Sequence, residues 1–242
     1  MTSHVVRSHR LQPLRAWREL RALVRNPEDT ERVFHIMQAL RGRTILRNLS
    51  RLERLRPDLV ERRDEVVDVL SNRAALAGLP EGSLGRHYLA FCQREGITPH
   101  GLVEASRAAG RREDDSVESW FERRGRDTHD LWHVVTGYGT HPGGEVCVVT
   151  FSFAQTGHWG FGVIAVAGTL KCAQAVGWRR SFAATWRAWR DGRQAGWLPG
   201  QDWAALLTRP LDEVRNALRI RPPKIDAATI EPMETAALAR SS

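Results

Sequence analysis

The sequence contains few cysteines. The three that are present, Cys92, Cys147 and Cys172, are odd in number and lie in apolar segments. Such thiols are typical of reduced core residues in a reducing compartment, and they exclude the disulfide-rich scaffold of a small secreted protein. We therefore expect no disulfide framework in this chain.

Lysine is almost absent. It occurs only at Lys171 and Lys224, so arginine supplies 34 of the 36 basic residues. A skew of this size is typical of genome base composition rather than of selection for phosphate contacts. No zinc-finger or RRM-type motif accompanies the net charge of +8. We therefore expect no nucleic-acid partner, and we assign the charge to attraction toward an anionic membrane surface.

Long apolar runs are also missing. The best of them, Gly160 to Leu170, is far shorter than the ~18 residues of a membrane-spanning helix. With 242 residues and 42% hydrophobic content, the chain is long enough to bury a sizeable core. We expect a disordered N-terminus over residues 1–10, a single domain over residues 11–221 and a C-terminal tail over residues 222–242.

Apolar residues recur with helical periodicity along most of the chain. Residues Ile45 to Leu55 and Leu59 to Leu70 predict two helices separated by Pro57-Asp58. Ser83 is a candidate N-cap for the helix that follows it. One segment conflicts with this pattern, because the β-branched and aromatic residues 146–153 (VCVVTFSF) are assigned to a strand by local propensity.

A group of metal-ligand residues lies between positions 129 and 145. On a helix, His129 and His133 share a face and Asp130 neighbours His133 at i,i+3. The glycine-rich segment 137–144 also contains a proline and cannot continue the helix, so the chain reverses and brings Glu145 back toward these side chains. Two imidazoles and two carboxylates predict a divalent metal site; the alternative is a His-Asp pair that only packs or hydrogen-bonds.

The spacing of these residues is similar to a family signature. His-Asp-x-x-His, followed after eleven residues by Glu, resembles the coenzyme Q (ubiquinone) biosynthesis family of helical, membrane-associated proteins that act at carbon 1 of the quinone head group. Further blocks occur in the family's order: NPEDT at 26–30 with Val33-Phe34, Ala39-Leu40 and Gly42, LPEGSLGRHYLAF at 79–91, Gln155-Thr156-Gly157, Asp202-Trp203 and residues 210–220. The resemblance covers about residues 12–221.

The resemblance implies a fold and a chemistry. The family's fold is all-α, so residues 146–153 are expected to be helical, with the metal site on a helix–loop–helix hairpin. The implied activity is metal-dependent, oxidative decarboxylation at carbon 1 of a polyprenylated 4-hydroxybenzoate-type intermediate. The expected ligands are His129, Asp130, His133 and Glu145. Zinc is the first candidate, and iron, cobalt and manganese fit the ligand set as well.

The resemblance also implies partners and a location. We expect a polyprenylated quinone precursor, a membrane surface and other quinone-biosynthesis enzymes as partners, and we leave a homodimer open. The expected place is the cytoplasmic face of a bacterial inner membrane, bound peripherally. In a eukaryote it would be the matrix side of the mitochondrial inner membrane.

Several further side chains are candidates for supporting roles. Arg126 lies one turn before His129 and could hold a substrate carboxylate, while Tyr138 and His141 in the reversing loop could transfer protons. Arg86, close to a predicted helix start, could bind an anion. For Arg126, Tyr138 and His141 the alternative is an ordinary surface role, and for Arg86 it is a salt bridge.

An aromatic stripe predicts a membrane-facing helix. Trp178, Phe182, Trp186 and Trp189 recur at helical spacing, with arginines on the other faces. The alternative is a stripe that packs into the core.

Two other functions compete with decarboxylation. The protein could be a non-catalytic scaffold that binds a prenyl lipid and organises the quinone-synthesis enzymes, with the metal as a structural clip. The adjacent His129-Asp130 pair is also found in HD-type metal phosphohydrolases. Those sites need additional His and Asp ligands, for which the sequence offers no convincing pair, so we rank this function last.

Overall fold

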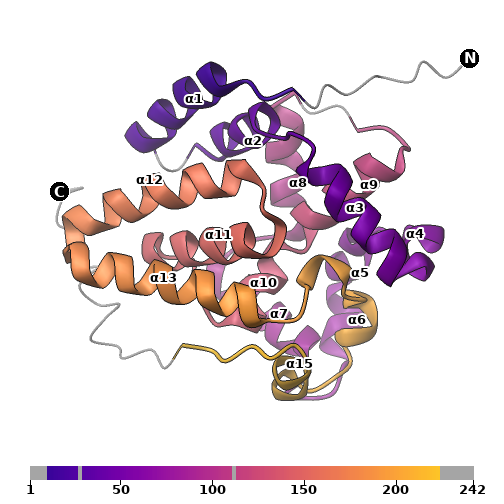
Figure 1. The fold of residues 1–242 in the computed structure, drawn as a ribbon. Helices are drawn as coiled ribbons and strands as arrows, with labels where there is room; N and C mark the ends of the chain where they lie inside the picture. Colours follow the sequence, from indigo (N-terminus) through magenta and orange to yellow (C-terminus); the bar gives the residue numbers. More distant parts are fainter. Residues whose placement is uncertain (1–9, 27–28, 111–112, 224–242) are drawn as a thin grey trace, which may run out of the picture.

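The computed structural model of the chain describes residues 10–26, 29–110 and 113–223. Within those ranges the chain forms fifteen α-helices, one short 3-10 helix and no β-strand (Figure 1). The predicted all-α, single-domain fold is therefore confirmed. Residues 1–9 and 224–242 lie outside the described residues, and with them most of the two predicted terminal tails.

The N-terminal part of the chain is built from six helices. They are α1 (Pro13–Arg25), α2 (Thr30–Ala39), α3 (Thr44–Leu55), α4 (Pro57–Arg62), α5 (Val66–Ser71) and α6 (Arg73–Ala77). The prediction of one helix from Leu59 to Leu70 is wrong, because Arg63 adopts a left-handed conformation with φ of 49° and ends α4.

Four helices follow and lead into the predicted metal site. They are α7 (Leu84–Glu95), α8 (Pro99–Ala108), α9 (Val117–Asp127) and α10 (His129–Thr136). The hydroxyl of Ser83 accepts a hydrogen bond from the Arg86 amide at 3.3 Å, which confirms the predicted cap of α7.

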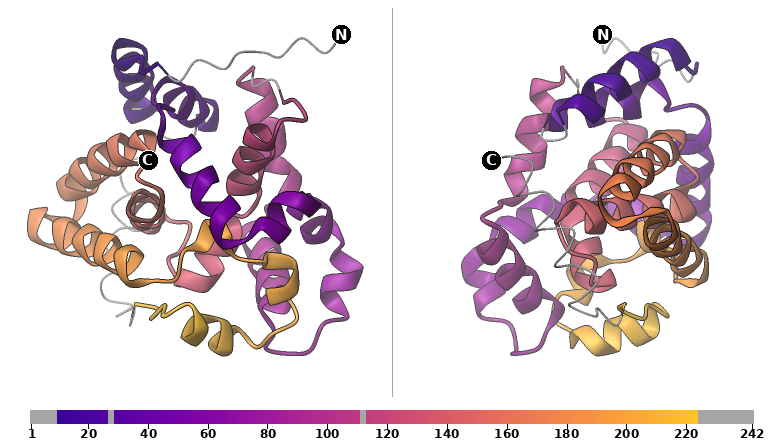
Figure 2. Two further views of the ribbon diagram at one scale, coloured as in Figure 1. Left: turned by 45° about the vertical axis from the view of Figure 1, so that its right-hand side comes forward. Right: turned by 90° about the vertical axis from the view of Figure 1, so that its left-hand side faces the viewer.

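Three long helices pack side by side in the C-terminal part of the chain. They are α11 (Pro142–Thr156), α12 (Trp159–Val176) and α13 (Trp178–Gln194), and they are followed by η1 (Leu198–Gly200), α14 (Trp203–Leu206) and α15 (Leu211–Ala217). Helix α11 contacts both of its long neighbours, and α12 also packs against α1 and α2 (Figure 2). Residues 146–153 are helical, so packing overrides their strand propensity.

Helix α12 is more apolar than the sequence suggested. Its 18 residues have a mean hydropathy of 1.3 and are only 28% buried, so its length and composition alone would allow it to cross a membrane. The criterion is weak for a single helix, because soluble core helices also meet it.

The main hydrophobic core fixes the position of the metal-site helices. Leu131 and Val135 of α10 and Val148 and Phe151 of α11 are fully or almost fully buried in one cluster with side chains of α7 and α15. Leu131 is two residues from both His129 and His133, so helical spacing puts it on the opposite side of α10 from the two histidines. The core therefore holds α10 and α11 from behind, and their polar side chains face the opposite way.

Candidate metal centre

The hairpin between α10 and α11 is set by short-range interactions. Gly137, with φ of 75°, ends α10, and its amide donates to the carbonyl of His133 at 2.8 Å. His141 caps α11, because its Nδ1 accepts a hydrogen bond from the amide of Gly144 at 3.1 Å. The reversal places Glu145 in the first turn of α11, opposite the histidines of α10.

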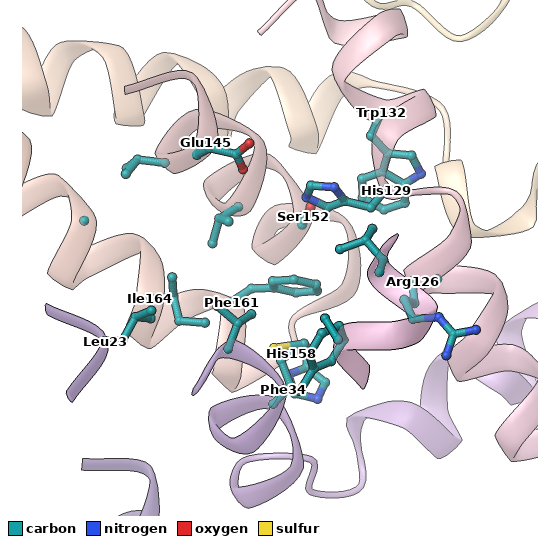
Figure 3. Close-up of a pocket in the computed structure, with 18 of the residues that line it drawn as sticks. Leu23, Phe34, Arg126, His129, Trp132, Glu145, Ser152, His158, Phe161 and Ile164 are labelled. Atoms are coloured by element: carbon teal, nitrogen blue, oxygen red, sulfur yellow. The ribbon is translucent and has the colours of Figure 1, made fainter. Parts of the chain in front are cut away.

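Three potential ligands converge across this hairpin. One donor atom from each of His129, His133 and Glu145 can be chosen so that all lie within 4.8 Å of one another. Nε2 of His133 is 3.4 Å from Oε1 of Glu145, close to the separation of about 3.4 Å that two ligands have on one tetrahedral zinc ion. Figure 3 shows the Glu145 carboxylate and the His129 ring facing each other across the pocket.

Both imidazoles are oriented by hydrogen bonds on the far side of the ring. Nδ1 of His133 donates to the carbonyl of Tyr138 at 3.0 Å, and Nδ1 of His129 donates to Oδ1 of Asp130 at 3.2 Å. The ring of Phe91 stacks on His133 with centroids 5.8 Å apart. These contacts leave Nε2 of each histidine as the free nitrogen, which is how metal-binding histidines are usually held.

The electrostatics of the group favour a cation between its members. Burial opposes the charged form of His129, but the hydrogen bond to Asp130 and the charges of Glu145 and Asp130 outweigh it and raise its pKa. Partial removal from water likewise raises the pKa of Glu145, whose side chain stays 41% exposed, but His133 and His129 have the larger combined effect and lower it. With Nδ1 protonated on both rings, the Glu145 carboxylate faces nitrogen lone pairs, so either a proton or a metal ion must lie between them.

Asp130 has a different place from the other three predicted ligands. It is not part of the converging group, and its Oδ1 contacts Nδ1 of His129 instead. In the part of the chain that the structure describes, no other group of three such side chains has the spacing of a metal site. The second His–Asp set that an HD-type phosphohydrolase needs is therefore not found among those residues.

The candidate catalytic side chains are held by other contacts. Arg126 lines the pocket, but its guanidinium pairs with Asp127, at 2.7 Å, and with Glu113. The hydroxyl of Tyr138 donates to Asp191 at 3.2 Å. Neither Tyr138 nor His141 lines the pocket, and His141 acts as a helix cap. Their catalytic roles stay predictions.

Arg86 also has a structural partner. Its guanidinium donates to the carbonyl of Ala77 at 2.7 Å, and the side chain does not line the pocket. The predicted anion site at this position therefore has no geometric support beyond the helix start.

The metal-site residues lie in the wall of a large cavity. It has a volume of about 1860 Å³ and is lined by residues from α1 to α3 and from α7 to α12. Leu23, Phe34 and Ile164 lie on the side away from Glu145 and His129 (Figure 3). A small-molecule site usually occupies ~300–1,000 Å³, so this cavity can hold a long apolar chain as well as a ring.

Two wall residues were missed by the sequence interpretation. Glu95, at the end of α7, accepts a hydrogen bond from the hydroxyl of Thr140, and both residues line the cavity. The Thr140 hydroxyl lowers the pKa of Glu95 against the opposing effect of burial. Thr140 lies inside the reversing loop, so its position next to the site could have been inferred, whereas the approach of α7 could not.

Comparison with known proteins gives a consistent result. The family model "Coenzyme Q (ubiquinone) biosynthesis protein Coq4" matches residues 24–224. Relatives named "Ubiquinone biosynthesis protein coq4, mitochondrial" include those of Aspergillus flavus, 34% identical over 61% of this chain and 50% of the relative, and Pyrenophora tritici-repentis, 32% identical over 77% of this chain and 58% of the relative. The chain thus spans about half the length of these relatives.

A solved structure supports the fold. A crystal structure from Nostoc punctiforme, of a protein assigned to ubiquinone biosynthesis, superposes with a TM-score of 0.66 and covers 86% of this chain and 98% of that chain. Its sequence identity of 22% makes this a statement about the fold alone. The family model covers most of the sequence, including every residue of the metal group, and the chain therefore belongs to the Coq4 family of coenzyme Q (ubiquinone) biosynthesis proteins.

Proposed function

We propose that the protein catalyses metal-dependent decarboxylation at carbon 1 of a polyprenylated 4-hydroxybenzoate-type intermediate: the carboxyl group leaves as carbon dioxide and a proton takes its place, or a hydroxyl group where an external two-electron oxidant accepts the electrons. The observation that carries the proposal is the position of His129, His133 and Glu145, which converge in the wall of an apolar cavity large enough for a prenylated ring. A site built only to brace the fold would be closed on all sides by protein ligands.

Each residue of the site has a defined task. The Nε2 atoms of His129 and His133 and the Glu145 carboxylate would hold the ion, with zinc as the first candidate. Asp130 and the Tyr138 carbonyl hold the two rings in the orientation and tautomer that expose Nε2. A bound divalent ion supplies the positive charge that stabilises negative charge on the ring as carbon dioxide leaves.

The cavity provides the binding energy for the tail. Its wall away from the metal group is formed by aliphatic and aromatic side chains, among them Leu20, Phe34, Met37, Phe161 and Ile164. Burying apolar area contributes ~25 cal/mol per Å², so an isoprenoid tail fixes the head group beside the ion without polar contacts of its own.

A scaffold role is the second candidate. It is favoured by the engagement of Arg126, Tyr138 and His141 in other contacts, which leaves few free acid–base groups near the ion. In that case the ion would brace the α10–α11 hairpin, and other quinone-synthesis proteins would bind to the lipid-loaded chain. Replacing His133 by alanine would then disrupt folding or assembly, whereas a catalytic ion could be lost without either effect.

The setting of this chemistry is proposed from the family. The fungal relatives are named as mitochondrial proteins. For this chain we propose a peripheral position at the cytoplasmic face of a bacterial inner membrane, or at the matrix side of the mitochondrial membrane in a eukaryote.

One experiment tests the function directly. The purified protein is analysed for bound metal and incubated with a prenylated 4-hydroxybenzoate, and the loss of the carboxyl group is followed by mass spectrometry. We expect decarboxylation by the wild type and by Glu53→Gln, which changes an exposed carboxylate in α3. Glu145→Gln should abolish it. Equal turnover by Glu145→Gln, or none by metal-loaded wild type, would contradict the proposal.

A further inference from the structure

Exposed apolar side chains gather on one side of the molecule. Among the described residues, thirteen large hydrophobic side chains are exposed, and ten of them lie in α1, α12 and α13 or directly before α1. They are Leu11, Leu14, Trp17, Val24, Trp159, Val166, Leu170, Trp178, Phe182 and Trp186. We call the outward sides of these three helices the outer face. The three other exposed hydrophobic residues are single side chains on α3 and α5 and need no explanation.

The spacing of the apolar residues along α12 and α13 places them on the outer face. Trp159, Val166 and Leu170 are spaced by seven and four residues, so they form one line along α12. In α13, Trp178 stacks on Phe182 and Trp186 stacks on Trp189, with centroids 5.8 Å and 5.0 Å apart. Trp178, Phe182 and Trp186 are 50–63% exposed, so these three side chains do not pack into the core, whereas Trp189 is half-buried.

The same three helices carry the excess charge of the protein. They contain ten of the 36 basic residues and two of the 28 acidic residues, so their surplus of eight equals the net charge of the whole chain, +8. The five arginines of α13 form no ion pair with any residue of the described ranges. Positive charge next to exposed tryptophan is complementary to an anionic lipid surface.

The cavity reaches the surface at this face. Val24 and Arg25 at the end of α1 and Lys171, Gln174 and Ala175 in the last turns of α12 line the cavity and are exposed. Lys171 donates to the carbonyl of Val24 at 3.2 Å and so bridges the two helices at this opening. Figure 1 shows α1, α12 and α13 along the same side of the fold.

We infer that the outer face docks on an anionic lipid bilayer, with the opening between α1 and α12 turned toward the lipid, so that a prenyl chain enters the cavity from the membrane. The inference rests on the proposed function for the identity of that chain. The unpaired arginines and the apolar line on α12 favour a bilayer over a second copy of the chain, whose outer face would carry the same positive charge.

The docking is interfacial and does not require α12 to span the membrane. Helix α12 packs against α1, α2, α11 and α13. Its partner α13 carries five arginines within 17 residues. Charges of this density remain at the level of the lipid head groups.

Vesicle binding tests the inference without any turnover. The metal-free protein is mixed with vesicles of phosphatidylcholine alone or of equimolar phosphatidylcholine and phosphatidylglycerol, and the bound fraction is measured by flotation. We expect binding to the anionic vesicles to be at least roughly tenfold tighter and to weaken with added salt.

Three variants locate the contact. Phe182→Ser with Trp186→Ser, and separately Trp17→Ser on α1, should weaken binding to the anionic vesicles severalfold or more. Leu55→Ser on α3 changes an equally exposed residue outside the face and should bind as the wild type. All of these side chains are exposed, so thermal unfolding should confirm that the variants remain folded.

Two double variants, each of which removes two positive charges, test the role of the arginines. Arg179→Gln with Arg180→Gln at the start of α13 should weaken binding roughly twentyfold, since one arginine near an anionic surface contributes about fivefold. Arg54→Gln with Arg107→Gln removes the same charge from exposed positions on α3 and α8 and should have little effect. Equal losses in both pairs, or equal binding to neutral and anionic vesicles, would overturn the inference. Failure of decarboxylation with intact vesicle binding would instead contradict only the proposed function.

Discussion

Nε2 of His133 lies 3.4 Å from Oε1 of Glu145, although eleven residues separate them in the sequence. The Nδ1 proton of the same ring is committed to the Tyr138 carbonyl at 3.0 Å. Nε2, the other nitrogen of the ring, therefore faces the Glu145 carboxylate, and a proton or a metal ion between the two atoms makes this contact favourable. This relationship underlies the proposed metal centre and the predictions that follow.

Removing the carboxylate of Glu145 should release the metal without unfolding the chain. The Glu145 side chain is 41% exposed, so Glu145→Gln preserves packing while it replaces an anionic ligand by a weak neutral one. Loss of a side chain that only hydrogen-bonds to a metal ligand lowers metal affinity by ~10–100-fold. Loss of the ligand Glu145 itself should lower the affinity for Zn²⁺ by more than this. Titration calorimetry on metal-depleted protein measures this. Unchanged affinity would exclude Glu145 as a ligand.

Asp130 should behave as a positioning residue. Because its carboxylate holds Nδ1 of His129, Asp130→Ala should lower zinc affinity by roughly 10–100-fold, and Asp130→Asn, which keeps an acceptor oxygen, by less. The optical spectrum of the cobalt-substituted protein should show that the coordination number of the ion is the same in both variants as in the wild type. A loss as large as that of Glu145→Gln, with a changed coordination number, would instead make Asp130 a fourth ligand.

The hairpin should depend on the absence of a side chain at Gly144. A Cβ atom there would lie 2.1 Å from the carbonyl oxygen of Gly139, and backbone atoms cannot move aside as a flexible side chain can. We expect Gly144→Ala to lower the free energy of unfolding by about 3 kcal/mol, the upper end of the usual cost of overpacking. In α9, Gly125→Ala meets open space and should be neutral or stabilising by up to about 1 kcal/mol. Urea unfolding compares the two variants, and equal stabilities would contradict the close approach.

The hairpin between α10 and α11 could largely be predicted from the sequence, whereas other parts of the fold could not. Helical spacing places His129 and His133 on one face and Leu131 on the other, and the glycine-rich segment predicts the reversal that brings Glu145 back. The break at Arg63 could not be foreseen, since a left-handed arginine leaves no local signal. The helix at residues 146–153 was predicted from the family, because local propensity alone favours a strand there.

The wall of the cavity could not be predicted for a different reason. It is assembled from helices far apart in the sequence, such as α1, α8 and α12, and no local pattern specifies which helices meet. The same holds for Arg126, whose partner Glu113 lies thirteen residues away. The role of Asp130 depends on its side-chain rotamer, which sequence spacing does not determine.

The helix pair α1–α2 should lose stability in acid. The Arg32 guanidinium, donating to Glu19 at 2.7 Å, lowers the pKa of that carboxyl below its ordinary value of 4.5 against the opposing effect of burial. A carboxyl with a lowered folded-state pKa stabilises the fold above pH 4.5, and this contribution is lost as the pH falls through the folded-state value. The free energy of unfolding, measured as a function of pH, should therefore fall less steeply in acid for Glu19→Gln than for the wild type. Parallel curves would contradict this.

Narrowing the cavity should weaken binding of a substrate with a long prenyl tail more than binding of a substrate with a short one. Ala167 of α12 lines the cavity, and a phenylalanine there would occupy space that the tail needs. We expect Ala167→Phe to raise KM for a long-tailed prenyl hydroxybenzoate by roughly tenfold, while a substrate with one isoprene unit is converted at the wild-type rate. Equal effects on both substrates would place the tail elsewhere.

The most direct test of the account is an anomalous diffraction map of crystals grown with Zn²⁺. The account predicts one strong peak within about 2.0–2.2 Å of Nε2 of His129, Nε2 of His133 and a carboxylate oxygen of Glu145. A map with no peak between these three atoms, from crystals that contain the metal, would contradict it.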